Sequence, residues 1–224
     1  MHIEPGIVDS AKMLLGVGTA AGTAGYSSKL VYNTLQERGH ISLALRSAIA
    51  TVLVFCFFQV LPHYAVGVSE VHFILGSTLF LILGAGPAAI GLALGLLVQG
   101  VFFAPMDLPQ YGINVTTLLV PLFAMRALAT KIIAPDTAYV DLSYRQTLAL
   151  STAYQGGVVA WVAFWAFYGQ GFGVANIASV LSFGGAYMLV VIVEPLVDLA
   201  VLAGAKSVRD LRKTGLVAPR LYKA

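Results

Sequence analysis

Charged residues and cysteines are both scarce in this sequence. Asp, Glu, Lys and Arg make up 10% of the 224 residues, and Cys56 is the single cysteine. One thiol excludes an internal disulfide and a cluster of thiolate metal ligands. So little charge cannot cover the surface of a soluble domain, and the mean hydropathy of +0.86 is far above the soluble range. We therefore expect an integral membrane protein.

Motifs for common enzyme chemistry are also missing. The nearest approach to a phosphate-binding loop, Gly204-Ala205-Lys206-Ser207, does not fit the pattern, because alanine stands directly before the lysine where glycine is required. No His-Glu-x-x-His or Gly-x-Ser-x-Gly pattern occurs. The chain is expected to have no enzymatic activity, no resident cofactor and no nucleic-acid partner, so any ATP hydrolysis would belong to partner subunits.

Apolar runs separated by polar or Gly/Pro breaks predict about seven transmembrane helices. The runs cover 11–35, 42–62, 71–84, 87–104, 114–131, 146–169 and 175–204. The third run is too short for an upright crossing and predicts a short or re-entrant helix, which ends at Gly84-Ala85-Gly86-Pro87. The expected fold is a single all-α polytopic membrane domain over residues 1–224.

The positions of Lys and Arg predict the orientation, because short cytoplasmic loops and tails retain positive charge. The C-terminal tail, residues 205–224, is basic. The connections after the first and fifth spans add Arg38, Arg46, Arg126, Lys131 and Arg145. With these inside, an odd number of spans puts the N-terminus outside, together with 62–70, 104–113 and 169–174.

Four histidines are the candidate metal ligands, and His2 is the most informative of them. The amine of Met1, the His2 amide and the His2 Nδ1 close adjacent five- and six-membered chelate rings in one plane. Such a plane suits Cu(II), Ni(II) or Co(II), and an imidazole from elsewhere would complete a square. The topology offers His63 and His72 on the outer face, whereas His40 falls inside.

His72 is the stronger partner for His2, since it begins an apolar helix where packing would hold its ring, whereas His63 follows Pro62 in a loop. Each of these histidines also has a plainer interpretation, as an interfacial side chain that hydrogen-bonds water or backbone. From the residues alone, both interpretations stay open.

Three motifs carry a resemblance to a known family. They are Met1-His2-Ile3-Glu4-Pro5-Gly6, the segment that ends in His72 and Gly76, and Gly112-Ile113-Asn114-Val115, joined by Leu97-Val98-Gln99-Gly100-Val101-Phe102-Phe103. With these motifs the chain resembles the cobalt/nickel substrate-binding component of energy-coupling factor transporters, the CbiM/NikM family. It departs from the family pattern at Pro5 and Ile7, and at Glu70-Val71.

The resemblance implies a subunit of the bacterial cytoplasmic membrane that captures Ni(II) or Co(II) at the extracytoplasmic face. The implied ligands are Met1, His2 and His72, with residues 1–10 inserted at the outer face. The implied partners are a membrane coupling subunit, a pair of cytosolic ATPases and, in some systems, a small accessory membrane subunit. The alternatives are a metal-independent membrane scaffold or a transporter subunit for another small solute.

Three further features have two interpretations each. Small residues at Gly18-x-x-x-Gly22 and Ala20-x-x-x-Ala24 favour either internal packing or docking to the coupling subunit, and Gly91-x-x-x-Gly95 favours internal packing. Glu194 and Asp198 are expected to be structural acids, with a proton relay as the alternative. Asn114 is expected to bond the N-terminal loop or to cap a helix.

Overall fold

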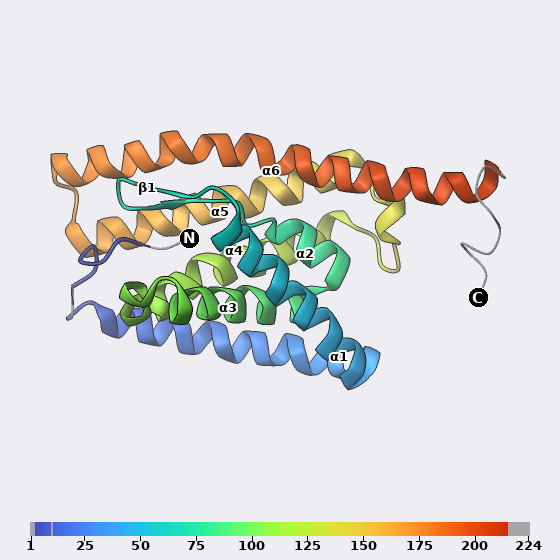
Figure 1. The fold of residues 1–224 in the computed structure, drawn as a ribbon, viewed down its shortest axis with the longest axis horizontal. Helices are drawn as coiled ribbons and strands as arrows, with labels where there is room; N and C mark the ends of the chain where they lie inside the picture. Colours follow the sequence, from blue (N-terminus) through green and yellow to red (C-terminus); the bar gives the residue numbers. More distant parts are fainter. Residues whose placement is uncertain (1–2, 10, 215–224) are drawn as a thin grey trace.

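The computed structural model describes the backbone of residues 3–9 and 11–214, and side chains as far as Arg209. Long helices form a bundle with a small β-hairpin near one end (Figure 1). The helices are α1 (Met13–Phe55), α2 (Gly76–Leu83), α3 (Ala85–Phe102), α4 (Tyr111–Ile132), α5 (Tyr144–Gln170) and α6 (Val174–Thr214). The shorter elements are the η1 π-helix (Cys56–Val60), the 3-10 helices η2 (Pro105–Gln110) and η3 (Tyr139–Asp141), and strands β1 (Tyr64–Val66) and β2 (Ser69–Val71).

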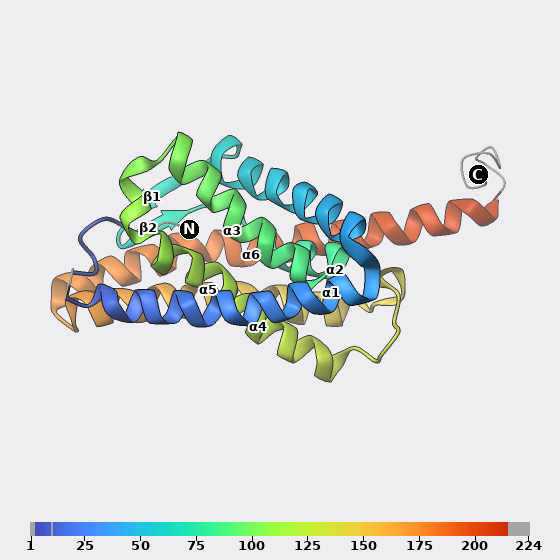
Figure 2. The same ribbon diagram turned by 90° about the horizontal axis from the view of Figure 1, so that it is seen from below.

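Gly39 divides α1 into two arms. Its φ of 74° and ψ of 171° are rarely adopted by other residues, so glycine can reverse the chain here without a steric penalty. Figure 2 shows the two arms running in opposite directions. The arms match the expected spans 11–35 and 42–62.

Helix α3 packs closely against α1 through its small residues. A Cβ on Gly91 would lie 2.3 Å from the Cβ of Ala50, and one on Gly95 would lie 2.5 Å from Cγ1 of Val54. The expected internal packing of Gly91-x-x-x-Gly95 is therefore confirmed, because no larger side chain would fit at either position.

The expected all-helical membrane fold is confirmed at the level of class. Within the described residues, four segments are long and apolar enough to cross a membrane: Met13–Val60, Ala85–Phe102, Pro105–Ile132 and Val174–Arg209. The first of these contains both arms of α1. Helix α2 is short, as expected; its 8 residues rise by about 12 Å, which is less than half of a bilayer core.

The bundle has two distinct ends (Figures 1 and 2). The N-terminal segment, the hairpin and the α5–α6 connection lie at one end. The Gly39 reversal, the α2–α3 junction and the C-terminal part of α6 lie at the other. A backbone bond from Glu4 to Val68, and a bond from the Lys12 ammonium to the Gly169 carbonyl, join segments that are far apart in the sequence.

The expectation of helix over 71–84 is wrong in its first five residues. Strands β1 and β2 pair in antiparallel register, with Tyr64 opposite Val71. The turn needs Gly67, whose φ is 62° and whose Cβ would lie 2.1 Å from the Ser179 carbonyl oxygen. Helix α2 then begins at Gly76, because residues before it donate their backbone N–H groups across the bundle and not along a helix.

Candidate metal centre

Residues 3–9 fold back into the bundle. The side chain of Ile3 is fully buried, and its N–H donates to Oδ1 of Asn114 at 2.9 Å. Ile3 also forms an antiparallel bridge with Ser69, and the Glu4 N–H donates to the Val68 carbonyl at 3.1 Å. The N-terminal segment thus adds a third chain beside the hairpin. Asn114 bonds the N-terminal loop as expected, four residues into α4 and so not as its cap.

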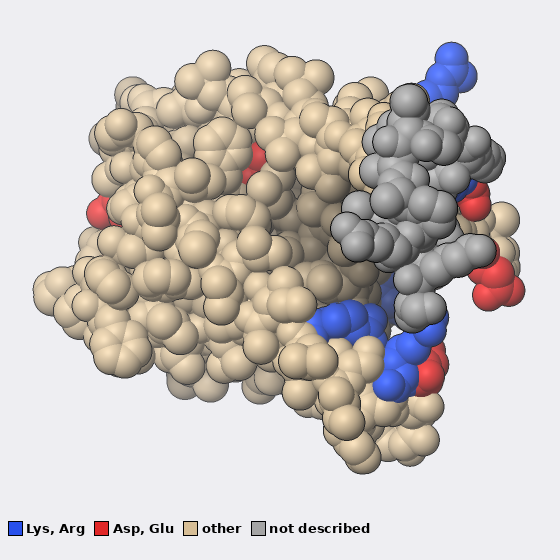
Figure 3. Space-filling view, turned by 45° about the vertical axis from the view of Figure 1, so that its right-hand side comes forward, with Lys and Arg blue, Asp and Glu red and all other residues tan. Residues whose placement is uncertain are grey.

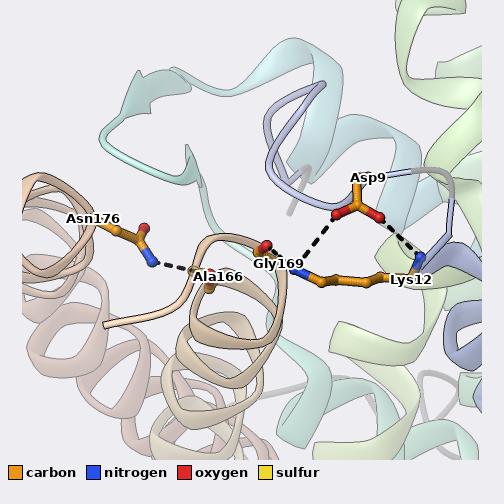
Figure 4. Close-up of polar contacts among 5 residues, drawn as sticks. All are labelled: Asp9, Lys12, Ala166, Gly169 and Asn176. Atoms are coloured by element: carbon orange, nitrogen blue, oxygen red, sulfur yellow. Dashed lines mark hydrogen bonds and ion pairs between the residues drawn. The ribbon is translucent and has the colours of Figure 1, made fainter. Parts of the chain in front are cut away.

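A second anchor holds the same segment at the end of α5 (Figure 4). Gly169 leaves room for the Ile7 carbonyl oxygen, which would lie 2.0 Å from a Cβ at that position. The Lys12 ammonium donates to the Gly169 carbonyl at 2.5 Å and lies 3.4 Å from the Asp9 carboxylate. The backbone N–H of Lys12 and its charge lower the pKa of Asp9. Both ends of the segment are therefore attached to the bundle.

The α5–α6 connection that receives this anchor is itself closed by one side chain. Nδ2 of Asn176 donates to the Ala166 carbonyl at 3.0 Å (Figure 4). It also donates to the Gly171 carbonyl at 2.7 Å. Two carbonyls at the end of α5 are satisfied in this way, which is what a helix C-terminus requires. The Gly169 carbonyl is thus held in place to accept the Lys12 ammonium.

His72 lies three residues beyond Ser69 along the chain and is only 1% exposed. Its ring is 4.3 Å from that of Phe58 between centroids, and Nδ1 is 3.2 Å from the Phe73 carbonyl oxygen. In the tautomer that donates this bond, the ring's lone pair is on Nε2, the form that a metal ligand needs. Packing and hydrogen bonding therefore fix the ring beside the chain that Ile3 joins.

Glu194 of α6 holds the segment that follows His72. Its carboxylate accepts the backbone N–H of Ile74 and, at 2.9 Å, that of Leu75, which adopts a left-handed φ of 52°. The Gln155 amide also donates to it, and the Tyr187 hydroxyl donates to Gln155 Oε1 at 2.7 Å. A fully buried carboxylate thus fixes residues two and three positions after the candidate ligand.

Asp198 continues this network by one helical turn. Its carboxylate accepts the hydroxyls of Ser77 and Thr78 at the start of α2. These contacts agree with the expectation that Glu194 and Asp198 are structural acids. Buried carboxylates require such donors, because an isolated charge in an apolar interior is very costly.

The comparison with protein families decides the identity of the fold. The model of the family described as CbiM, cobalt uptake substrate-specific transmembrane region, matches residues 2–211. The chain belongs to the CbiM family. It is accordingly a multi-pass membrane component of metal uptake.

One solved structure has a similar fold. A crystal structure of a truncated transition metal transporter superposes with a TM-score of 0.69, over 91% of this chain and 97% of that one. The two sequences are 16% identical, so the likeness supports the fold alone. No curated protein matches the chain significantly.

The structure of this CbiM protein describes only one of the three expected ligand residues, His72. Met1 and His2 lie outside the described residues. His72 is buried, three residues after Ser69, which pairs with Ile3. His63 lies before β1, with Nδ1 3.2 Å from the Leu61 carbonyl. His40 follows the Gly39 reversal at the other end of the bundle. Among residues 3–9 and 11–214, no group of three or more His, Cys, Asp or Glu side chains could hold a metal ion.

Two parts of the centre escaped the sequence analysis. The hairpin of β1 and β2 lies in two runs of three residues, which are too short for an alternating pattern to stand out. The bonds from Glu194 to Ile74 and Leu75 join residues about 120 positions apart. Only the cost of an intramembrane acid signalled that Glu194 needed partners.

Proposed function

We propose that this chain is the substrate-binding subunit of an energy-coupling factor transporter, and that it captures Ni(II) or Co(II) at the extracytoplasmic face. The observation that carries the proposal is the attachment of buried Ile3 to Asn114 and Ser69, with His72 three residues further along the same chain. A terminus in solvent would need none of these contacts.

The proposed ligands are the Met1 amine, the His2 amide and imidazole, and the His72 imidazole. Consecutive Cα atoms are 3.8 Å apart, so the anchored Ile3 restricts how far the first two residues can extend from the hairpin. Ile3 pairs with Ser69 in antiparallel orientation. If this pairing continued, the residues before Ile3 would run in the direction of β2, towards His72. Four nitrogens in a plane suit Ni(II), low-spin Co(II) and Cu(II).

The nature of the ligands dictates how binding depends on pH. An amide and an amine must lose protons to coordinate the ion, so binding releases protons and weakens on acidification. Planar nitrogen sites bind Cu(II) more tightly than Ni(II) or Co(II), so availability of the ion selects the substrate. Family membership favours cobalt, and nickel has the same ligand preference.

We further propose that the N-terminal end of the bundle faces outward and that the helical segments make seven passes, with the 205–224 tail in the cytoplasm. Lys and Arg gather at the opposite end, as the face turned forward in Figure 3 illustrates. Residues 72–75, which form neither helix nor strand, connect β2 to α2 and lengthen the path of this segment, which supports its role as the third pass. The whole chain is one domain in this proposal.

The small residues of the first arm of α1 support docking to a membrane coupling subunit. A Cβ on Gly18, Gly22 or Gly25 would meet nothing within 4 Å, so these glycines have no role in packing inside the described chain. A groove of about 920 Å³ on a neighbouring face of the same arm is lined by Ala20 and Ala24, among others, and not by these glycines. A partner helix could approach this face closely. The coupling subunit would bring two cytosolic ATPases as the source of energy, since the sequence contains no phosphate-binding loop motif.

Uptake by whole cells tests the proposal. Cells that carry the chain with its partner subunits should accumulate radioactive cobalt or nickel, and His2→Ala should abolish this uptake while leaving the protein in the membrane. His40→Ala is the matched control, because it alters a histidine at the other end of the bundle. Equal uptake by the His2→Ala variant would rule out the proposed centre.

A further inference from the structure

A polar pocket lies at the end of the bundle opposite His72. Its volume is about 260 Å³, and its walls come from both arms of α1, the α2–α3 junction and α4. The lining residues include Arg38, Arg46 and Arg126, and the one acid among them is Glu37. We call it the arginine pocket. Three guanidinium groups against one carboxylate leave the pocket strongly positive, which favours an anionic occupant.

Arg46 is held in the pocket with one of its three guanidinium nitrogens unpaired in the described part of the chain. Nη1 donates to the Leu83 carbonyl at 2.8 Å, and Nε donates to the Ser42 carbonyl at 3.3 Å. Nη2 is buried and has no hydrogen-bond partner in the described part of the chain. A buried charged donor without an acceptor is costly, so this geometry is suited to an anion that accepts from Nη2.

The start of α3 adds positive potential to the same pocket. Gly84 and Ala85 line it, and no side chain caps α3 and no acid lies in its first turn. The 18-residue helix therefore directs free backbone N–H groups and the positive end of its dipole to this place. Gly84 has a φ of 91°, and a Cβ there would lie 3.4 Å from Nη1 of Arg46, so glycine keeps the approach open.

The surroundings of the pocket indicate how such an anion would arrive. Ile41, Leu45 and Ile49 of the second arm of α1 are 77%, 60% and 50% exposed, and Tyr32 of the first arm is 61% exposed. Apolar side chains so exposed on a membrane protein face acyl chains. An anion that binds beside them would have the chemistry of a phospholipid headgroup, in which the phosphate is esterified to a glycerol that carries two acyl chains.

We propose that the arginine pocket is a binding site for a phosphate group. Arg46 would donate to the phosphate oxygens from a fixed position, with Arg38 and Arg126 completing the charge and the α3 N-terminus contributing backbone donors. A membrane phospholipid and free phosphate share this chemistry. The site is separate from the proposed metal centre and does not depend on it.

Thermal unfolding of the purified full chain in detergent tests the proposal. Phosphatidylglycerol should raise the Tm by on the order of 5 °C near saturation, because a ligand of the folded state stabilises it. Diacylglycerol, which lacks the phosphate, should give no such rise. A rise with inorganic phosphate equal to that with phosphatidylglycerol identifies free phosphate as the ligand, whereas a rise with the lipid alone identifies the headgroup.

Variants assign the effect to the pocket. Arg46→Gln should lose most of the rise, and so should the double variant Arg38→Gln/Arg126→Gln, which keeps the Arg46 bonds to Leu83 and Ser42. Arg145→Gln is the matched control, because it removes an exposed arginine outside the pocket. The proposal is overturned if phosphatidylglycerol and inorganic phosphate both leave the wild-type Tm unchanged, or if the double variant keeps the full rise.

Discussion

The bond between Ile3 and Asn114 gives the sharpest prediction about the metal centre. In Asn114→Ala, the N–H of a fully buried residue loses its acceptor, which costs about 1–3 kcal/mol. The cost applies to the inserted state of the N-terminal segment, which we propose is the state that binds the cation. Affinity for Co(II) should therefore fall by about 5- to 150-fold, at 1.4 kcal/mol per factor of ten.

Calorimetric titration of the purified chain with Co(II) measures this loss. Asn114→Asp keeps an acceptor oxygen for the Ile3 N–H, so its affinity should fall less than that of Asn114→Ala. Thr117→Val is the second control, because that hydroxyl donates only to the carbonyl of Asn114 within α4, at 2.7 Å. If Asn114→Ala binds as tightly as Thr117→Val, the anchored segment does not carry the ligands.

Three other substitutions test the anchor of the N-terminal segment, the bonds of Glu194 and the proposed docking face. Gly169→Ala should lower both the Tm and the Co(II) affinity, because its Cβ would collide with the Ile7 carbonyl, whereas Gly173→Ala meets nothing within 4 Å and should lower neither. Glu194→Ala should lower the Tm, because the N–H groups of Ile74 and Leu75 lose their acceptors at a cost of about 1–3 kcal/mol each. Glu194→Gln should retain part of that stability. Equal values of Tm for the two variants would show that the carboxylate oxygens are not the essential acceptors. Gly22→Leu should keep the Tm and the Co(II) affinity but prevent copurification with the coupling subunit, and an intact complex would exclude docking at this face.

Much of the helical arrangement could be predicted from the sequence, because hydrophobicity along a membrane chain is a strong and local signal. The expected runs 87–104, 114–131 and 146–169 each lie within a few residues of an observed helix. A break between the runs 11–35 and 42–62 was also expected, and the structure places it at Gly39.

Long-range polar contacts were less predictable. Asn114 was expected either to bond the N-terminal loop or to cap a helix, and the structure shows the first of these. The start of α2 was misplaced because Ile74 and Leu75 give their N–H groups to Glu194, and no local pattern encodes a partner so far along the chain. The residues that follow the hairpin thus obtain their shape from α6.

Co(II) titration of the His72→Ala variant, in a protein whose first residue is an unextended Met1, tests whether the His72 imidazole completes the metal centre. We expect one tight Co(II) site in the wild type, with release of protons on binding, and loss of that site in His72→Ala. His63→Ala, which alters a histidine before β1, should bind as the wild type does. Tight binding retained in His72→Ala and lost in His63→Ala would show that His63, and not His72, is the ligand.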